Sequence, residues 1–197
     1  MNNNFFIKYE YAKKMLETEL DILIHSFELK HGYTPVEHMK SRIKSISSIQ
    51  KKLERRGYSY TEENIEKHVT DVIGVRIVVS FLSDVYDIVS LITHSTNIIL
   101  KERRDYIANP KESGYTSYHL IVLVPIYLES YVEYIPAEIQ VRTVAMDFWA
   151  SLDHKIRYKF KEEIPEEVQV EMKNYAKDIQ ELDRKMYHMN QIMNKYQ

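Results

Sequence analysis

Cysteine is absent from this chain of 197 residues, which excludes disulfides and thiolate metal sites. Long apolar runs are also absent, since no stretch approaches the roughly 20 apolar residues of a membrane-spanning helix. No sign of charge dominates: 27 Lys and Arg stand against 29 Asp and Glu. This balance argues against a protein that coats nucleic acid along its whole surface, but it allows a local basic cleft. Because the N-terminus lacks a cationic, apolar leader, we expect a cytoplasmic protein without a membrane partner.

Hydrophobic spacing predicts an α+β protein. Helices are expected over 8–30, 83–93, 143–158 and after Pro165, with strands over 72–81, over 119–127 and within 130–142. Residues 95–112 are interpreted as charged and irregular. The stretch 35–44 stays open, because Thr34 resembles the start of a capping box while Ser45 could equally begin a helix that runs to Arg56.

The C-terminal segment has the most regular pattern in the chain. Its apolar residues alternate at spacings of four and three: Val168, Met172, Tyr175, Ile179, Leu182, Met186, Met189, Met193 and Tyr196. This is a coiled-coil pattern. A helix packed on its own domain would also explain it, but the strict repeat favours self-association. We therefore predict a domain over 1–160 and an oligomerisation helix over 165–197.

Two predicted strands carry charged residues, and for the first of them an ordinary amphipathic strand with one solvated face is the plainer explanation when it is taken alone. In "AEIQVRT", Glu138, Gln140 and Arg142 share one face, while the apolar residues between them face the core. Asp71 opens the strand "VIGVRIVV", and Arg76 interrupts it. Because burying an unpaired cation is costly, Arg76 is expected to reach a carboxylate, a phosphate or a cleft.

A phosphate-binding group is predicted near residue 44. Lys44, Ser48 and Lys52 would share one face of a helix and offer two ammonium groups and a hydroxyl to a polyphosphate. For any one of these lysines, a solvated helix face is the plainer explanation. If the strands of Asp71 and Glu138 are neighbours, the two acids could hold Mg²⁺. Tyr115, which follows Gly114, could stack on a base. Together these features indicate a nucleotide site for phosphoryl-type transfer.

Five segments in order carry a family resemblance: "SRIKSISSIQKK", "TDVIGVRIVVSF", "DYIANPKESGYTSYHLIV", "AEIQVRTVAMDFWASLDHKIRYK" and the C-terminal heptads. Over residues 35–197 the chain resembles the RelA/SpoT-type alarmone synthetases, and more narrowly their small, single-domain members. The resemblance implies a nucleotidyltransferase-like mixed sheet flanked by helices. It also implies transfer of the β,γ-diphosphate of ATP to the 3′-hydroxyl of GTP or GDP, which gives pppGpp or ppGpp and AMP in the stringent response.

The same resemblance implies a role for each matching residue. Asp71 and Glu138 would bind Mg²⁺, and Glu138 would help to deprotonate the attacking hydroxyl. The residues expected to bind ATP are Arg42, Lys44, Ser48, Lys52 and Arg76. Those expected to bind GTP or GDP are Arg104, Lys111, Tyr115, His119, Gln140 and Asp147. Asp147 stands at a place often held by Asn.

Further expectations follow from the resemblance. Relatives of this kind form tetramers, so we expect a homotetramer, and an alarmone or RNA as an allosteric ligand is left open. No hydrolase is expected. The alternative functions are a regulatory module that binds single-stranded RNA in the same basic, Tyr-rich cleft and a purely structural oligomeriser.

Overall fold

A computed structural model describes residues 5–160, 164–193 and 195–196 of the chain. Residues 1–4 and 161–163 lie outside the described ranges. The expectation that the chain has no leader rests partly on residues 1–4 and is therefore not examined by the structure. Of the helices in the described ranges, none combines the length and the apolar character needed to cross a membrane.

One mixed sheet organises the molecule. Its order is β1-β2-β5-β4-β3, and the strands are β1 (Val36–Ile43), β2 (Ile73–Val79), β3 (Ile99–Asp105), β4 (Tyr118–Tyr127) and β5 (Val132–Thr143). β2 and β5 run parallel, and every other pair of neighbours is antiparallel. β5, which carries Glu138, is therefore the neighbour of β2, which begins two residues after Asp71, as the proposed pairing of these acids requires.

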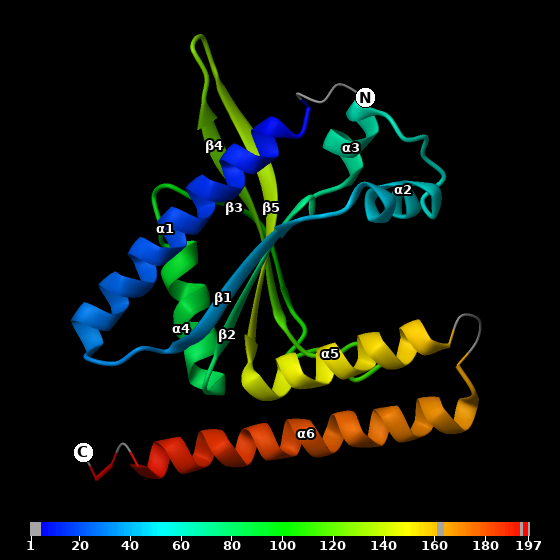
Figure 1. Cartoon of the computed structure of the whole chain (residues 1–197). Helices are drawn as coiled ribbons and strands as arrows, with labels where there is room; N and C mark the ends of the chain where they lie inside the picture. Colours follow the sequence, from blue (N-terminus) through cyan, green and yellow to red (C-terminus); the bar gives the residue numbers. More distant parts are fainter. Residues whose placement is uncertain (1–4, 161–163, 194, 197) are drawn as a thin grey trace.

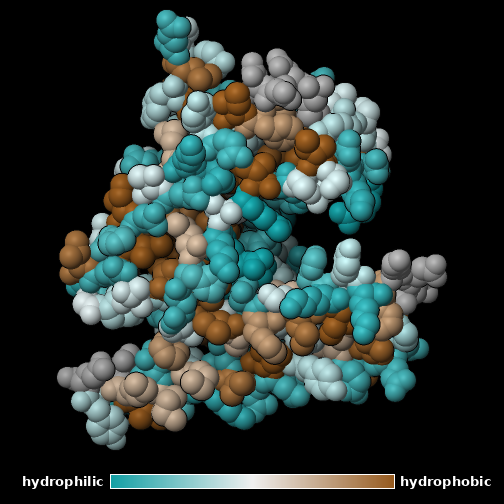
Figure 2. Space-filling view, in the orientation of Figure 1, coloured by the Kyte–Doolittle hydropathy of each residue, from teal (hydrophilic) through white to brown (hydrophobic). Residues whose placement is uncertain are grey.

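Helices cover one face of this sheet and border the other. α1 (Ile7–His31) and α4 (Leu82–Thr93) pack on the same face (Figure 1), where their apolar residues join those of the strands in one core. α2 (Ile46–Glu54) and α3 (Glu62–His68) lie at one end of the sheet. α5 (Val144–Lys159) and α6 (Glu166–Met193) lie at the other end. Between these two pairs the second face of the sheet stays open, and the space-filling view shows a hollow there with hydrophilic walls (Figure 2).

Most predicted elements are confirmed, including the helices over 8–30, 83–93 and 143–158 and the helix after Pro165. The open stretch 35–44 forms strand β1, so a helix that starts at Thr34 is wrong. Ser45 instead caps α2, because its side chain accepts a hydrogen bond from the Ser48 amide. The helix start at Ser45, a polar cap followed by amphipathic spacing, thus outweighs the capping-box pattern at Thr34.

Two elements differ from the prediction or escaped it. Residues 95–112 were expected to be irregular, but 99–105 form β3. This is an edge strand with exposed side chains, and charged residues are common at sheet edges because they discourage pairing with other chains. α3 was not predicted; it is a short helix capped by Thr61, whose side chain accepts a hydrogen bond from the Asn64 amide.

The heptad residues of the C-terminal segment divide between two surroundings. Val168, Met172 and Ile179 pack with Trp149 of α5 in a small second core. The others remain exposed over about half of their surface or more: Tyr175, Leu182, Met186, Met189, Met193 and Tyr196. Packing on the same chain therefore explains only part of the pattern, and the division of the chain at residues 160–165 stays a prediction.

Candidate functional site

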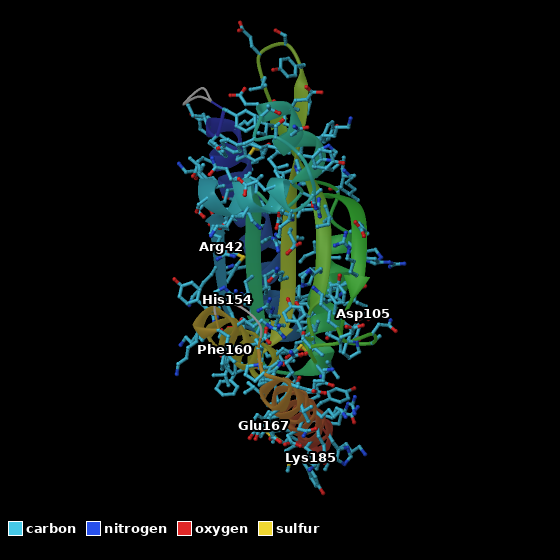
Figure 3. The ribbon with its side chains drawn as sticks, turned by 90° about the vertical axis from the view of Figure 1, so that its right-hand side faces the viewer. Arg42, Asp105, His154, Phe160, Glu167 and Lys185 are labelled. Carbon is cyan, nitrogen blue, oxygen red and sulfur yellow. The ribbon has the colours of Figure 1, made fainter. Side chains whose placement is uncertain are left out.

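The sheet register brings most of the predicted site residues together on its open face. One row of paired residues crosses all five strands: Lys40, Arg76, Gln140, His119 and Arg104. The next row contains Arg42, Gly74 and Glu138. Because paired residues of neighbouring strands project to the same side, both rows face the hollow. Figure 3 looks onto this face, with Arg42 toward one edge of the sheet and Asp105 toward the other.

Two adjoining cavities occupy the β1–α2 side of the face. The larger, of about 760 Å³, is lined by Arg42, Lys44, Ser48, Lys51 and Arg55 among others. The smaller, of about 300 Å³, shares Arg42 and Lys44 with it and adds Asp71, Arg76, Glu138 and Gln140. Gly74 also lines the smaller cavity, where the lack of a side chain leaves room. Asp71, two residues before β2, and Glu138 of the neighbouring β5 therefore face one space.

Asp71 is held by two ammonium groups. Lys44 Nζ donates to Oδ2 at 2.6 Å, and Lys52 Nζ donates to Oδ1 at 2.7 Å. Burial opposes ionisation of Asp71, but the hydrogen bonds from the two lysines outweigh it and hold the pKa of this carboxyl below its ordinary value. The expected convergence of Lys44 and Lys52 is present, although α2 begins only at Ile46 and Lys44 precedes it.

Arg76 reaches a carboxylate, as its position in a buried strand predicted. Its Nη1 lies 3.2 Å from Asp147 Oδ1 at the start of α5. Within the described ranges, Arg76 Nε is one of two buried side-chain N–H groups that lack a protein partner. An unsatisfied donor beside a cavity is a costly feature that a ligand oxygen or nitrogen would relieve.

Tyr115 and His119 form the opposite, β4 side of the face. Tyr115 Oη lies 2.9 Å from His119 Nε2, and His119 Nδ1 lies 3.6 Å from Glu138 Oε1. Burial, with the nearby charges of Arg142, Lys111 and Arg104, lowers the pKa of His119 to about 3. The imidazole is therefore neutral near pH 7 and can accept at one ring nitrogen while it donates at the other.

Arg142 was placed beside Glu138 and Gln140 from the sequence but was given no role there, and the structure puts it at the centre of the β4 side. Its guanidinium is buried and donates to four groups: Tyr115 Oη (2.6 Å), Gln140 Oε1 (2.6 Å), Ser117 Oγ (3.3 Å) and Asp147 Oδ1 (3.3 Å). Three of these partners belong to predicted site residues. Strand alternation did put Arg142 on the face of Glu138 and Gln140, and this was the available signal.

The remaining cations take different positions. Lys111 Nζ lies 4.9 Å from the ring centroid of Tyr115 and 4.5 Å from that of Tyr106. Arg104 is exposed on β3, where it binds Glu102 of the same strand through two hydrogen bonds. It lies beside His119 in the register and does not contact the cavities described above. The exposed side chain of Arg42 lines both cavities.

The donor set around the smaller cavity fits a hard divalent cation. Asp71 is kept ionised, and both acids present oxygen ligands to the same space. Over the residues that the structure covers, no group of three or more His, Asp or Glu side chains could hold a metal alone. Mg²⁺ usually binds proteins through one or two carboxylates and takes its other ligands from water and substrate phosphates. Two carboxylates beside a cationic cavity match this requirement.

Comparison with known proteins gives consistent matches. Residues 41–163 match the family described as the region found in RelA/SpoT proteins. The GTP pyrophosphokinase YwaC of Bacillus subtilis is 43% identical over 93% of this chain and 87% of its own length. The crystal structure of small alarmone synthetase 1 from Bacillus subtilis bound to its product pppGpp superposes with a TM-score of 0.87, at 32% identity over 95% of each chain. Small alarmone synthetase 2 of the same organism gives 0.85, at 40% identity over 95% of this chain and 97% of its own.

Proposed function

The chain belongs to the RelA/SpoT family, and from this premise we propose that it is a GTP/GDP 3′-pyrophosphokinase. It transfers the β,γ-diphosphate of ATP to the 3′-hydroxyl of GTP or GDP and releases AMP. The observation that carries the proposal is the arrangement of the open face. Two carboxylates stand between a cavity lined by cations and a buried Tyr–His–Arg network.

The β1–α2 side of the face suits the triphosphate of ATP, and we call it the donor half. Its cations come from the end of β1 and from the last turn and C-cap of α2, so they surround the cavity from two directions. Lys44 and Lys52 now bind Asp71. A polyphosphate would compete for both ammonium groups, because charge-assisted hydrogen bonds form equally well to phosphate oxygens.

Mg²⁺ is the cofactor that this donor set fits, with Asp71 and Glu138 as its protein ligands. When bound, such an ion neutralises the charge that develops on the transferred group. The contribution of this chain is to keep Asp71 ionised and to hold Glu138 by a hydrogen bond from Gln140. The free carboxylate oxygen of Glu138 is then available to accept the proton of the attacking hydroxyl.

The β4 side suits the guanine nucleotide, and we call it the acceptor half. A purine that stacks on Tyr115 would have to displace one of the two cations near that ring, Lys111 or Arg142. Arg142 is buried with four hydrogen bonds, whereas Lys111 is exposed. Lys111 is therefore the cation expected to turn toward the acceptor's phosphates, and Arg142 is expected to stay.

The RNA-binding alternative fits this site less well. Asp71 and Glu138 are mostly buried among the cations that would have to bind an RNA backbone, with side-chain exposures of 17% and 15%. Such acids repel phosphates unless a metal ion lies between them. A clamp for single-stranded RNA gains nothing from them.

Turnover of the purified chain tests the proposal. Labelled ATP is incubated with GMP, GDP or GTP, with and without Mg²⁺, and the products are separated. We expect AMP and a 3′-pyrophosphorylated guanine nucleotide only when Mg²⁺ and an acceptor are both present. No guanine-dependent AMP, together with salt-sensitive RNA binding, would favour the alternative. Added ppGpp that remains intact would support synthesis without hydrolysis.

We also propose that the exposed apolar residues of α6 bind another copy of the chain, as part of a tetramer. Leu182 and Met186 are exposed and lie four residues apart on α6, and Val144 and Phe148 of the neighbouring helix α5 are exposed apolar residues as well. Figure 2 shows apolar residues along α5 and α6 at the surface. The substitution Leu182→Asp is expected to lower the mass measured by light scattering, while the matched control Lys177→Asp keeps it. An unchanged mass for Leu182→Asp would contradict this interface.

A further inference from the structure

The loop of residues 111–117, which carries Tyr115, turns at a glycine. Gly114 N donates to Lys111 O at 2.8 Å, and Lys111 N donates to Tyr115 O at 3.1 Å. Gly114 has a φ of +78°, in the left-handed region that side chains rarely tolerate. Because Gly114 directly precedes Tyr115, the position of the Gly114 backbone sets the position of the Tyr115 Cα, and with it that of the tyrosine ring.

Helix α6 contacts this glycine in two ways. Gln180 Nε2 donates to Gly114 O at 3.1 Å. A Cβ at residue 114 would lie only 2.3 Å from the Ala176 Cβ. The helix and the loop therefore approach more closely than a residue other than glycine at position 114 would allow. Gln180 and Ala176 are one turn apart and lie on the same side of the helix. The loop therefore rests on α6 at the residue before Tyr115.

The helix is itself fixed where it touches the loop. Ala176 is buried with Met172 and Trp149. Seven residues beyond Ala176, Asp183 accepts a hydrogen bond from Thr143 Oγ1 at 2.8 Å, and both side chains are buried. Thr143 caps α5 and directly follows Arg142. The same helix face thus holds the end of β5 and the loop, the two segments that supply the Arg142–Tyr115 hydrogen bond.

We infer that Gln180 and Ala176 are positioning residues for the acceptor: they hold Gly114 so that Tyr115 Oη meets Arg142 and His119 before the nucleotide arrives. This rests on the proposed function, since it assumes that Tyr115 receives guanine. It gives the inner face of α6 a role in the site that is separate from the association expected of its outer face. Preordering a binding loop raises affinity, because less conformational freedom is lost on binding.

The test compares Gln180→Ala with Gln191→Ala. Gln191 lies on the same helix, and its side chain donates a hydrogen bond to Tyr187 one turn earlier in that helix. For Gln180→Ala we expect the KM for GDP to rise about three- to tenfold, as for the loss of one hydrogen bond. The KM for ATP should stay within about twofold of wild type, since α2, which lines the donor cavity, lies at the other end of the sheet from α6 (Figure 1). Gln191→Ala should match wild type in both constants.

Hydrogen exchange provides a readout that does not depend on turnover. Amides of residues 111–117 should exchange faster in Gln180→Ala than in wild type or Gln191→Ala, at an unchanged mass by light scattering. Gln180→Glu, which keeps the size of the side chain but loses the donor, should behave like Gln180→Ala. Equal exchange of the loop in all four proteins, with an unchanged KM for GDP, would overturn the inference. If wild type forms no AMP, the proposed function fails, and the exchange data still decide whether α6 orders the loop.

Discussion

The two halves of the cleft hold their functional groups by different forces. In the donor half, exposed cations line an open cavity, and two ammonium groups share the carboxylate of Asp71. In the acceptor half, a buried guanidinium, a neutral imidazole and a phenol are joined by hydrogen bonds. Contacts of the first kind can pass from a carboxylate to a phosphate, whereas those of the second kind must persist while a base binds. The donor half is thus arranged to exchange partners, and the acceptor half to keep them.

The largest effect is expected where the halves meet. Glu138→Gln keeps the size of the side chain and its ability to form hydrogen bonds but removes the base. The rate of AMP formation should therefore fall by about 10²- to 10⁴-fold. The melting temperature should change little, because an amide can still bond to Gln140. Full turnover by this variant, measured with labelled ATP and GDP, would show that Glu138 is not the base of the reaction.

A second prediction concerns the hydrogen bonds of the acceptor half. Arg142→Ala leaves Asp147 and the Tyr115 hydroxyl with fewer partners, so the free energy of unfolding should fall by about 3–5 kcal/mol. The matched control is Arg157→Ala, which breaks an ion pair between Arg157 and Asp153 in which the arginine side chain is 47% exposed; it should cost about 0–1 kcal/mol. Denaturant titration measures both changes. Equal losses would mean that the buried network adds nothing to stability.

Arg142→Lys sharpens the same comparison by activity. It keeps the charge but cannot supply the geometry that four partners require. The KM for GDP should rise on the order of tenfold, and the KM for ATP should stay close to that of wild type. A parallel rise in both constants would show that the two halves are not independent.

The next prediction concerns the contribution of His119 to the pH dependence of stability. Its folded pKa, about 3, lies below the ordinary value of 6.5, so between these values the unfolded chain binds a proton that the folded chain does not. Stability contributed by the neutral ring is complete above about pH 6.5 and falls as the pH drops, by at most about 1.4 kcal/mol per pH unit. His119→Asn should reduce this slope in denaturant titrations between pH 6.5 and 4. An identical slope in the variant would place the titration elsewhere.

The smallest expected effect is a change in stability caused by Asp71 in the donor half, and it appears at the lowest pH. Because the folded pKa of Asp71 is lowered from 3.8, its stabilisation is present above that value and is lost only as the pH falls below it. The stability difference between wild type and Asp71→Asn should therefore stay constant from pH 7 to about 4 and shrink at lower pH. A difference that already narrows near pH 6 would contradict the assignment.

Much of the donor half could be predicted from the sequence. Polar residues at helical spacing identified Lys44 and Lys52, and strand alternation identified Glu138, which lies where the two halves meet. These signals are local, so a single segment contains them. The strand β3 was missed because its charges serve a sheet edge, and charged segments without alternation look like loops.

The acceptor half depends on contacts between distant segments, and local patterns do not contain these. Arg142 draws its partners from a loop, a strand and the first turn of α5. Heptad spacing in α6 predicted an apolar stripe but could not say that Ala176 would meet Gly114. Such pairings arise only once the sheet and its helices have packed.

Transfer of the β-phosphorus of ATP tests the central claim most directly. ATP labelled at the β-phosphate is incubated with GDP, Mg²⁺ and the purified chain, and the labelled products are separated. Pyrophosphoryl transfer by the cleft moves this label to the guanine nucleotide and leaves unlabelled AMP. Label that stays in ADP, or that is released as free diphosphate in the presence of GDP, would contradict the account.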